Sequence, residues 1–154
     1  MKRGWAALGS LAFLVLAPGT VAGLVPFWIS GWRLRPPVLG LAAFRWLGGA
    51  LVAAGLAVLL DSFARFALRG LGTPAPVLPP TRLVVTGLYR HVRNPMYVAI
   101  LALVGGQALL LGDPRLAAWG GLLGIAFHLF VVAHEEPALG RTFGAEYEAF
   151  RANV

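Results

Sequence analysis

The chain has 154 residues, of which 58% are hydrophobic and 12% charged, and this is too apolar for an ordinary soluble domain. It has no cysteine, which excludes disulfides, thiolate nucleophiles and zinc–cysteine sites. The formal charge of +7 is, in a membrane protein, more often a topology signal than a nucleic-acid footprint. We therefore expect no nucleic-acid partner. Because Lys2 is the only lysine and Ala, Gly and Pro are abundant, we expect a GC-rich bacterial coding sequence and a protein of the inner membrane.

Four apolar stretches predict an all-α integral membrane protein with about four transmembrane helices. The first covers about residues 5–29 and follows a basic start. A signal peptide cleaved after residues 20–22 is the alternative for this stretch. The apolar run continues through "GLVPFWIS", so we favour an uncleaved span that bends near Pro18 and Gly19.

The other three apolar stretches are also expected to form transmembrane helices. The second covers about residues 39–60 and is expected to continue as a helix through residues 61–70. The third runs from Pro95 to about residue 112 and the fourth from Pro114 to about residue 133. Only "GDP" lies between them, which predicts a tight helical hairpin. Small residues let helix backbones approach closely, and the hairpin offers Gly105, Gly106, Gly120, Gly121 and Gly124.

The arginines predict the orientation of the chain in the membrane. With the N-terminus inside, the cytoplasmic side receives Lys2, Arg3, Arg65, Arg69, Arg82, Arg90, Arg93, Arg141 and Arg151. The outer side receives Arg33, Arg35, Arg45 and Arg115, of which Arg45 is expected to reach toward the headgroups. This asymmetry follows the positive-inside rule. It places both termini and the long connection before the third span on the cytoplasmic side.

Several polar residues lie within or beside the spans. Asp61 and Arg65 are spaced for an i,i+4 ion pair. Gln107 and His128 lie inside the third and fourth spans, where interhelical hydrogen bonding and ligand contact are equally compatible with the pattern. The adjacent acids Glu135 and Glu136 end the fourth span; they are either solvated or accept hydrogen bonds from ribose hydroxyls or a ligand ammonium.

An amphipathic helix is predicted after Pro137. Its apolar side has helical spacing, and charged residues take the other faces. This pattern indicates a helix that lies at the membrane interface. There it would cover a pocket between the hairpin and the preceding loop. The residues on the apolar side are Leu139, Phe143, Tyr147 and Phe150.

Two segments, "GTPAPVLPPTRLVVTGLYRHVRNPMYVAI" and "EEPALGRTFGAEYEAF", resemble the isoprenylcysteine carboxyl methyltransferase and phospholipid N-methyltransferase superfamily. The resemblance covers about residues 72–154 of what we expect to be a single membrane domain, with residues 1–71 as N-terminal spans. It implies a helical membrane enzyme that binds S-adenosylmethionine at the cytoplasmic side. The enzyme would methylate a lipid-like acceptor from the bilayer, as a carboxylate or as an amine.

The resemblance also implies which residues act. The arginine–proline–tyrosine segment, the paired acids and a glycine-rich turn of the third span would line the cofactor pocket. This set is Tyr89, His91, Arg93, Asn94, Pro95, Tyr97, Gly106, Gln107, His128, Glu135 and Glu136. Arg93, with His91, suits the cofactor carboxylate. Catalytic roles fall on Arg93, Glu136 and Tyr147, with the last two as bases for an amine acceptor, and no metal is expected.

Two departures from the superfamily pattern concern the acceptor. Asn94 stands where the prenylcysteine enzymes have His, and Asn153 replaces an arginine near the C-terminal end of the pattern. Two other functions are compatible with the motif. One is a sterol-type ene reductase that binds NADPH, because such enzymes carry a similar R-[HN]-P-x-Y stretch. The other is a non-catalytic membrane protein that has kept the fold.

Overall fold

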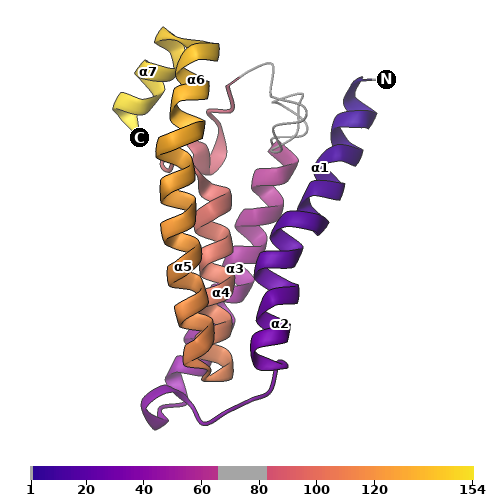
Figure 1. The fold of residues 1–154 in the computed structure, drawn as a ribbon, viewed down its shortest axis with the longest axis vertical. Coiled ribbons are helices and arrows are strands. Elements are labelled where there is room, and N and C mark those ends of the chain that lie inside the picture. Colours follow the sequence, from indigo (N-terminus) through magenta and orange to yellow (C-terminus); the bar gives the residue numbers. More distant parts are fainter. Residues whose placement is uncertain (1, 66–82) are drawn as a thin grey trace.

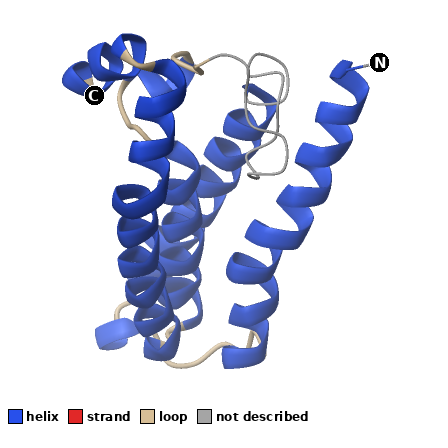
Figure 2. Cartoon of the chain, turned by 45° about the horizontal axis from the view of Figure 1, so that its top comes forward, coloured by secondary structure: helices blue, strands red, loops and turns tan. Residues whose placement is uncertain are grey.

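The computed structural model describes residues 2–65 and 83–154, and these contain helices but no strand. The helical runs lie along the long axis of the molecule, and both termini lie at the same end (Figure 1). In the part of the chain that the structure describes, Figure 2 shows helices and loops and no strand. In chain order the α-helices are α1 Lys2–Gly19, α2 Val25–Ser30, α3 Ala43–Arg65, α4 Pro95–Leu111, α5 Pro114–Phe130, α6 Glu136–Phe143 and α7 Ala145–Asn153.

The expected all-α membrane architecture is confirmed. Three helical runs, Leu11–Ser30, Ala43–Arg65 and Pro114–Phe143, are long and apolar enough to cross a membrane. The shorter apolar helix α4 has 17 residues, or roughly 25 Å of helix, which is near the minimum for a span. The second span begins later than expected because Val38–Gly40 forms a 3₁₀ turn with Leu39 at a φ of 52°. The part of its expected continuation beyond Arg65 lies outside the described residues.

The first span is irregular at Thr20–Leu24, just after the predicted bend. These five residues form a π-helical turn in which the N–H of Val25 donates to the carbonyl oxygen of Thr20. Pro26 lacks an N–H, so the carbonyl oxygen of Ala22 loses its regular α-helical donor. It accepts instead from Nε2 of Gln107 at 2.7 Å. Gln107 therefore makes an interhelical hydrogen bond, one of its two sequence alternatives.

A second contact ties the same turn to α5. Nε1 of Trp119 donates to the carbonyl oxygen of Val21 at 2.9 Å. The π turn frees this oxygen because the N–H of Val25 has moved to Thr20. Two side chains from two neighbouring helices thus satisfy the carbonyls that the irregular turn exposes.

The closest approach of two helices is between α3 and α4. A Cβ atom added to Gly48 would lie 2.4 Å from the backbone nitrogen of Leu110, and one added to Gly106 would lie 2.8 Å from the carbonyl oxygen of Gly48. Gly55 repeats this contact toward the start of α4, with Ala99. The predicted hairpin of α4 and α5 is present and is joined by Gly112 and Asp113 alone. Between α4 and α5 themselves, however, the glycines make only looser contacts: an added Cβ on Gly120 would lie 3.4 Å from Val104, and one on Gly124 would lie 3.9 Å from Leu101.

Asp113 organises the end of the bundle where α4 and α5 meet. Its side chain is fully buried and caps α5 by accepting from the backbone N–H of Arg115 at 3.0 Å. The guanidinium of Arg115 lies 2.7 Å from the carboxylate, and Nε of Arg35 lies 3.4 Å from it. The hydrogen bonds from Arg115 hold the pKa of Asp113 below its ordinary value.

Replacing Asp113 by Ala should lower the free energy of unfolding by about 1–3 kcal/mol, because a helix cap and charge-assisted hydrogen bonds are lost together. Since the folded-state pKa is the lower one, this stability is present above the ordinary pKa of 3.8 and is lost as the pH falls through the folded value. The thermal unfolding midpoint in detergent, measured from about pH 7 to about pH 3, should fall more in the wild type than in the variant. Equal falls would show that Asp113 does not contribute.

Candidate active site

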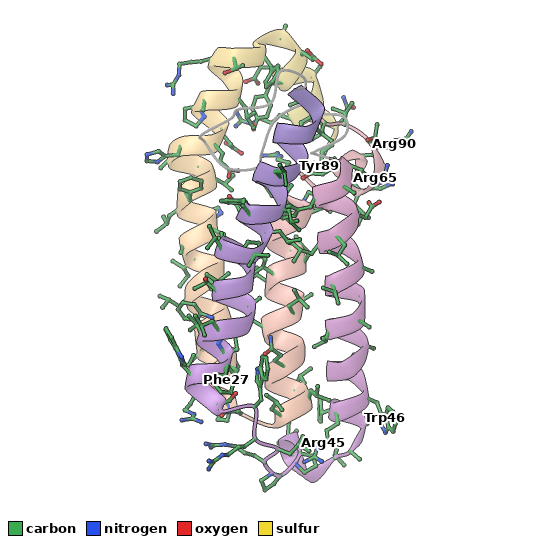
Figure 3. All side chains as sticks on the ribbon, turned by 90° about the vertical axis from the view of Figure 1, so that its right-hand side faces the viewer. Phe27, Arg45, Trp46, Arg65, Tyr89 and Arg90 are labelled. Carbon is green, nitrogen blue, oxygen red and sulfur yellow. The ribbon has the colours of Figure 1, made fainter. Side chains whose placement is uncertain are left out.

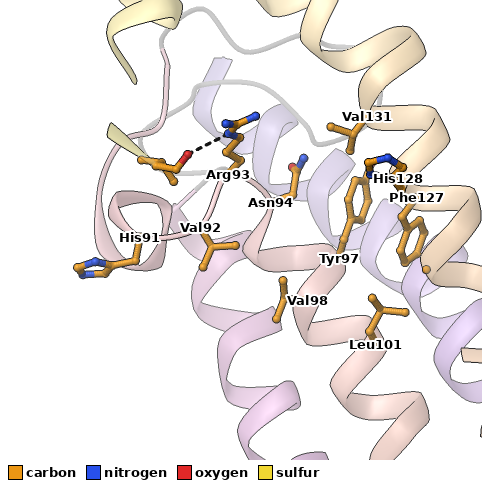
Figure 4. Close-up of a pocket in the computed structure, with 12 residues that line it drawn as sticks. His91, Val92, Arg93, Asn94, Tyr97, Val98, Leu101, Phe127, His128 and Val131 are labelled. Atoms are coloured by element: carbon orange, nitrogen blue, oxygen red, sulfur yellow. Dashed lines mark hydrogen bonds between the residues drawn. The ribbon is translucent and has the colours of Figure 1, made fainter. Parts of the chain in front are cut away.

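An open groove of about 420 Å³ lies between the start of α4 and the end of α5, at the end of the bundle that carries both termini (Figures 1 and 4). Figure 4 shows Arg93, Asn94 and His128 in its upper part and the apolar side chains of Val98 and Leu101 below them. The volume is within the usual range for small-molecule sites. The groove is lined by His91, Val92, Arg93, Asn94, Tyr97, Val98, Leu101, Gly124, Phe127, His128, Val131 and Val154.

Arg93 connects the groove to the C-terminal helices. Its Nη1 donates to Oε1 of Glu136 at 2.9 Å. Nε donates to the carbonyl oxygen of Val154 at 3.1 Å, the dashed line in Figure 4, and Nη2 to that of Arg151 at 3.4 Å. These carbonyls belong to the end of α7, where a helix has unpaired acceptors and favours a cation. One guanidinium therefore fixes α6 and α7 beside the groove.

Glu135 plays the matching role for α4. Its carboxylate accepts from Nδ2 of Asn94 at 3.1 Å and from the hydroxyl of Tyr97. Asn94 occupies the N-cap position of α4, and Pro95 is the first helical residue, where the third span is predicted to start. The Asn94 side chain makes no capping hydrogen bond. The amide instead helps to hold the acidic residue at the rim of the groove.

The ring of Tyr97 stacks on Phe127, with centroids 4.4 Å apart and an interplanar angle of 13°. The two rings form an aromatic wall of the groove (Figure 4). Sequence reasoning missed Phe127. It lies within a continuous apolar run of α5, and only the rotation of that helix toward α4 distinguishes it from its neighbours.

The acid pair does not sit at a helix end, which corrects the expectation for the fourth span. The helix continues to Phe143 through a π turn at Val131–Glu135. Pro137 explains the turn, because a proline ring clashes with the carbonyl four residues earlier in a regular α-helix. The break comes at Gly144, whose φ of 51° and ψ of −123° redirect the chain into α7. The predicted amphipathic segment is thus divided into α6 and α7.

Two buried tyrosines lie behind the groove. Burial raises the pKa of Tyr89, and the charge of Glu135 adds to the effect. Burial also raises the pKa of Tyr147, followed by the charge of Glu136. Both phenols are therefore protonated at neutral pH, which makes Tyr147 a weaker candidate base than Glu136.

Gly87 lies in the first of the two segments that resemble the superfamily, and the structure shows why glycine stands there. Its φ is 64°, and an added Cβ would lie 2.4 Å from Nε of Arg65. Arg65 is fixed by the predicted i,i+4 ion pair with Asp61, at 2.7 Å. The glycine therefore lets the segment before α4 pack directly on this ion pair.

The structure brings most of the predicted site residues together. His91, Arg93, Asn94, Tyr97 and His128 line the groove. Glu135 and Glu136 join it through the hydrogen bonds described above, whereas Tyr89, Pro95 and Tyr147 are buried nearby. Two residues lie elsewhere. Gly106 packs on α3, and Gln107 binds the first span deeper in the membrane, so neither contributes to the groove.

The comparison with family models covers this whole region. The model described as phospholipid methyltransferase matches residues 43–146, two thirds of the chain. The chain belongs to the phospholipid methyltransferase family. The matched range includes every groove residue except Val154. Searches of curated proteins and of solved structures gave no significant match.

Membership of the phospholipid methyltransferase family confirms the resemblance read from the sequence. It makes the chain a membrane methyltransferase that acts on lipids. The match starts at Ala43, so it includes α3, which the sequence motifs alone did not cover. This agrees with the structure, in which α3 packs against the helix that begins at the groove.

Proposed function

We propose that this chain transfers the methyl group of S-adenosylmethionine to a lipidic or prenylated acceptor at the cytoplasmic face of a bacterial inner membrane. The observation that carries the proposal is the paired arrangement at the groove. Glu136 holds Arg93, and Glu135 holds Asn94 and Tyr97. These contacts hold a guanidinium, two carboxylates and an aromatic ring at one rim of the groove. Each contact joins residues 93–97 to the acid pair of the fourth span.

The residues present fit this cofactor. Its carboxylate suits the guanidinium of Arg93, with His91 nearby, because arginine pairs with carboxylates in a bidentate way. Its ammonium and ribose hydroxyls suit the carboxylates of Glu135 and Glu136. The stacked rings of Tyr97 and Phe127 offer an aromatic surface to a cationic sulfonium. We therefore assign cofactor binding to these residues.

When bound, the cofactor supplies a methyl group activated on a sulfonium. The chain would then contribute mainly positioning, because methyl transfer needs the nucleophile in line. An amine acceptor must lose a proton, and Glu136 is the candidate base. A carboxylate acceptor needs no base, and the apolar lower groove would favour loss of charge by excluding water. Both acceptor chemistries fit the groove. The family match to methyltransferases favours methyl transfer over the reductase alternative.

Binding and transfer assays on the full chain in detergent test the proposal. Calorimetry should detect binding of S-adenosylmethionine and S-adenosylhomocysteine but not of NADPH. Transfer of labelled methyl groups into prenylcysteines, phosphatidylethanolamines and crude lipid then identifies the acceptor. NADPH binding would support the reductase instead. Failure to bind any of the three would leave a non-catalytic protein with the same fold.

A further inference from the structure

The end of the bundle opposite the groove carries an excess of positive charge. Four arginines and one acid, Asp113, lie in residues 27–46 and 109–119, all within the described chain, which leaves a net charge of +3. Figure 3 shows Arg45 and Trp46 at this end and Arg65 and Arg90 at the other. In our orientation this end faces outward, where the positive-inside rule disfavours arginine. The four arginines are Arg33, Arg35, Arg45 and Arg115.

The charge of +3 remains after the charge of Asp113 has been counted. The Asp113 side chain has no exposed surface and is already shared by Arg115 and Arg35. The side chain of Arg35 is nevertheless 46% exposed, and that of Arg115 is 51% exposed. Arg33 is exposed as well. Two half-exposed guanidinium groups, those of Arg35 and Arg115, therefore lie against one carboxylate that is closed to solvent, and the exposed Arg33 is two residues from Arg35.

The backbone that carries these arginines is fixed. The N–H of Arg35 donates to the carbonyl oxygen of Leu111 at 2.9 Å. A Cβ on Gly112 would lie 2.2 Å from the carbonyl oxygen of Pro36, so the loop rests directly on the turn of the hairpin. The guanidinium of Arg45 donates to the carbonyl oxygen of Arg35. Groups that are held in place before binding lose less entropy when a ligand arrives.

Exposed tryptophans indicate the depth at which these arginines lie in the membrane. Trp28, Trp32 and Trp46 are 70%, 55% and 81% exposed. Tryptophan is enriched at the level of the lipid headgroups. The ring of Trp32 is held there by its hydrogen bond to Gln107 at 3.1 Å. The arginines therefore lie where lipid phosphates are the available anions.

We propose that Arg33, Arg35 and Arg115 form a binding site for the phosphodiester of an anionic phospholipid. Guanidinium groups match phosphate oxygens in geometry as well as in charge. The net positive charge favours an anionic over a zwitterionic headgroup, because the ammonium of a zwitterion would be repelled. The site is separate from the groove and does not depend on methyl transfer.

Quenching of tryptophan fluorescence by brominated lipids tests the site in the full chain reconstituted into vesicles. Brominated phosphatidylglycerol and brominated phosphatidylcholine are compared as quenchers. The wild type should prefer phosphatidylglycerol by about tenfold or more, since each arginine near the headgroups contributes to anionic-lipid affinity. The double variant Arg33→Gln/Arg35→Gln should lose most of this preference. Arg141→Gln, an exposed arginine of α6 at the other end, should retain it.

Three results would overturn the proposal: equal quenching by the two lipids, an undiminished preference in the double variant, or loss of the preference in Arg141→Gln. Inorganic phosphate is added at constant ionic strength as a further arm. If it abolishes the preference, the cluster is a site for soluble anions, not for lipid. Circular dichroism checks folding of the variants. Should the double variant not fold, Arg33→Gln leaves the Arg35–Asp113 pair intact and should reduce the preference by about threefold.

Discussion

Replacing Arg93 by Ala is expected to weaken binding of S-adenosylmethionine by tenfold or more, which is about 1.4 kcal/mol. The guanidinium lines the groove and is held by Glu136 at 2.9 Å, so its position is fixed before a ligand arrives. Its loss removes a charge-assisted, bidentate partner and also releases the end of α7. Calorimetry with S-adenosylmethionine and S-adenosylhomocysteine on the full chain in detergent measures the change.

Two further variants separate the role of Arg93 from general charge. Arg93→Lys keeps the positive charge but loses the planar fork, so its affinity should lie between those of wild type and Arg93→Ala. Arg90→Gln removes an exposed arginine only three positions away that does not line the groove, and it should bind as the wild type does. If Arg93→Ala also binds normally, the assignment of Arg93 to the cofactor is wrong.

The features that the sequence predicted well depend on neighbours along the chain. The Asp61–Arg65 ion pair follows from a spacing of four residues within one helix. The start of α4 at Pro95 follows from local helix-start preferences. The superfamily motif likewise marks a continuous segment. For this reason it located Arg93, Asn94 and Tyr97 before any helix was placed.

The features that the sequence did not predict depend on how helices are rotated against each other. Gln107 has the polarity of a ligand residue, but the π turn of the first span turns a carbonyl toward it and uses it there. Phe127 looks like any lipid-facing residue until α5 places it on Tyr97. Glu135 and Glu136 were expected at a helix end because the apolar run of the fourth span stops just before them. A π turn absorbs Pro137 and lets the helix continue.

The same limit applies to the glycines, whose contacts between helices lead to a prediction on stability. Gly48→Ala should destabilise the protein by about 1–3 kcal/mol, because the new methyl group meets the backbone of α4 and the two helices must separate. Gly49→Ala is the matched control: an added Cβ there has no atom within 4 Å, so the gain in helix propensity should leave stability unchanged or slightly higher.

Gly106→Ala and Gly105→Ala form the same pair on α4, since an added Cβ meets α3 only at Gly106. Thermal unfolding midpoints of the four variants in detergent provide the measurement. Because the groove begins on α4, separating the helices should also weaken cofactor binding in the Gly48 and Gly106 variants. Equal midpoints within each pair would mean that α3 and α4 do not approach as closely as the structure shows.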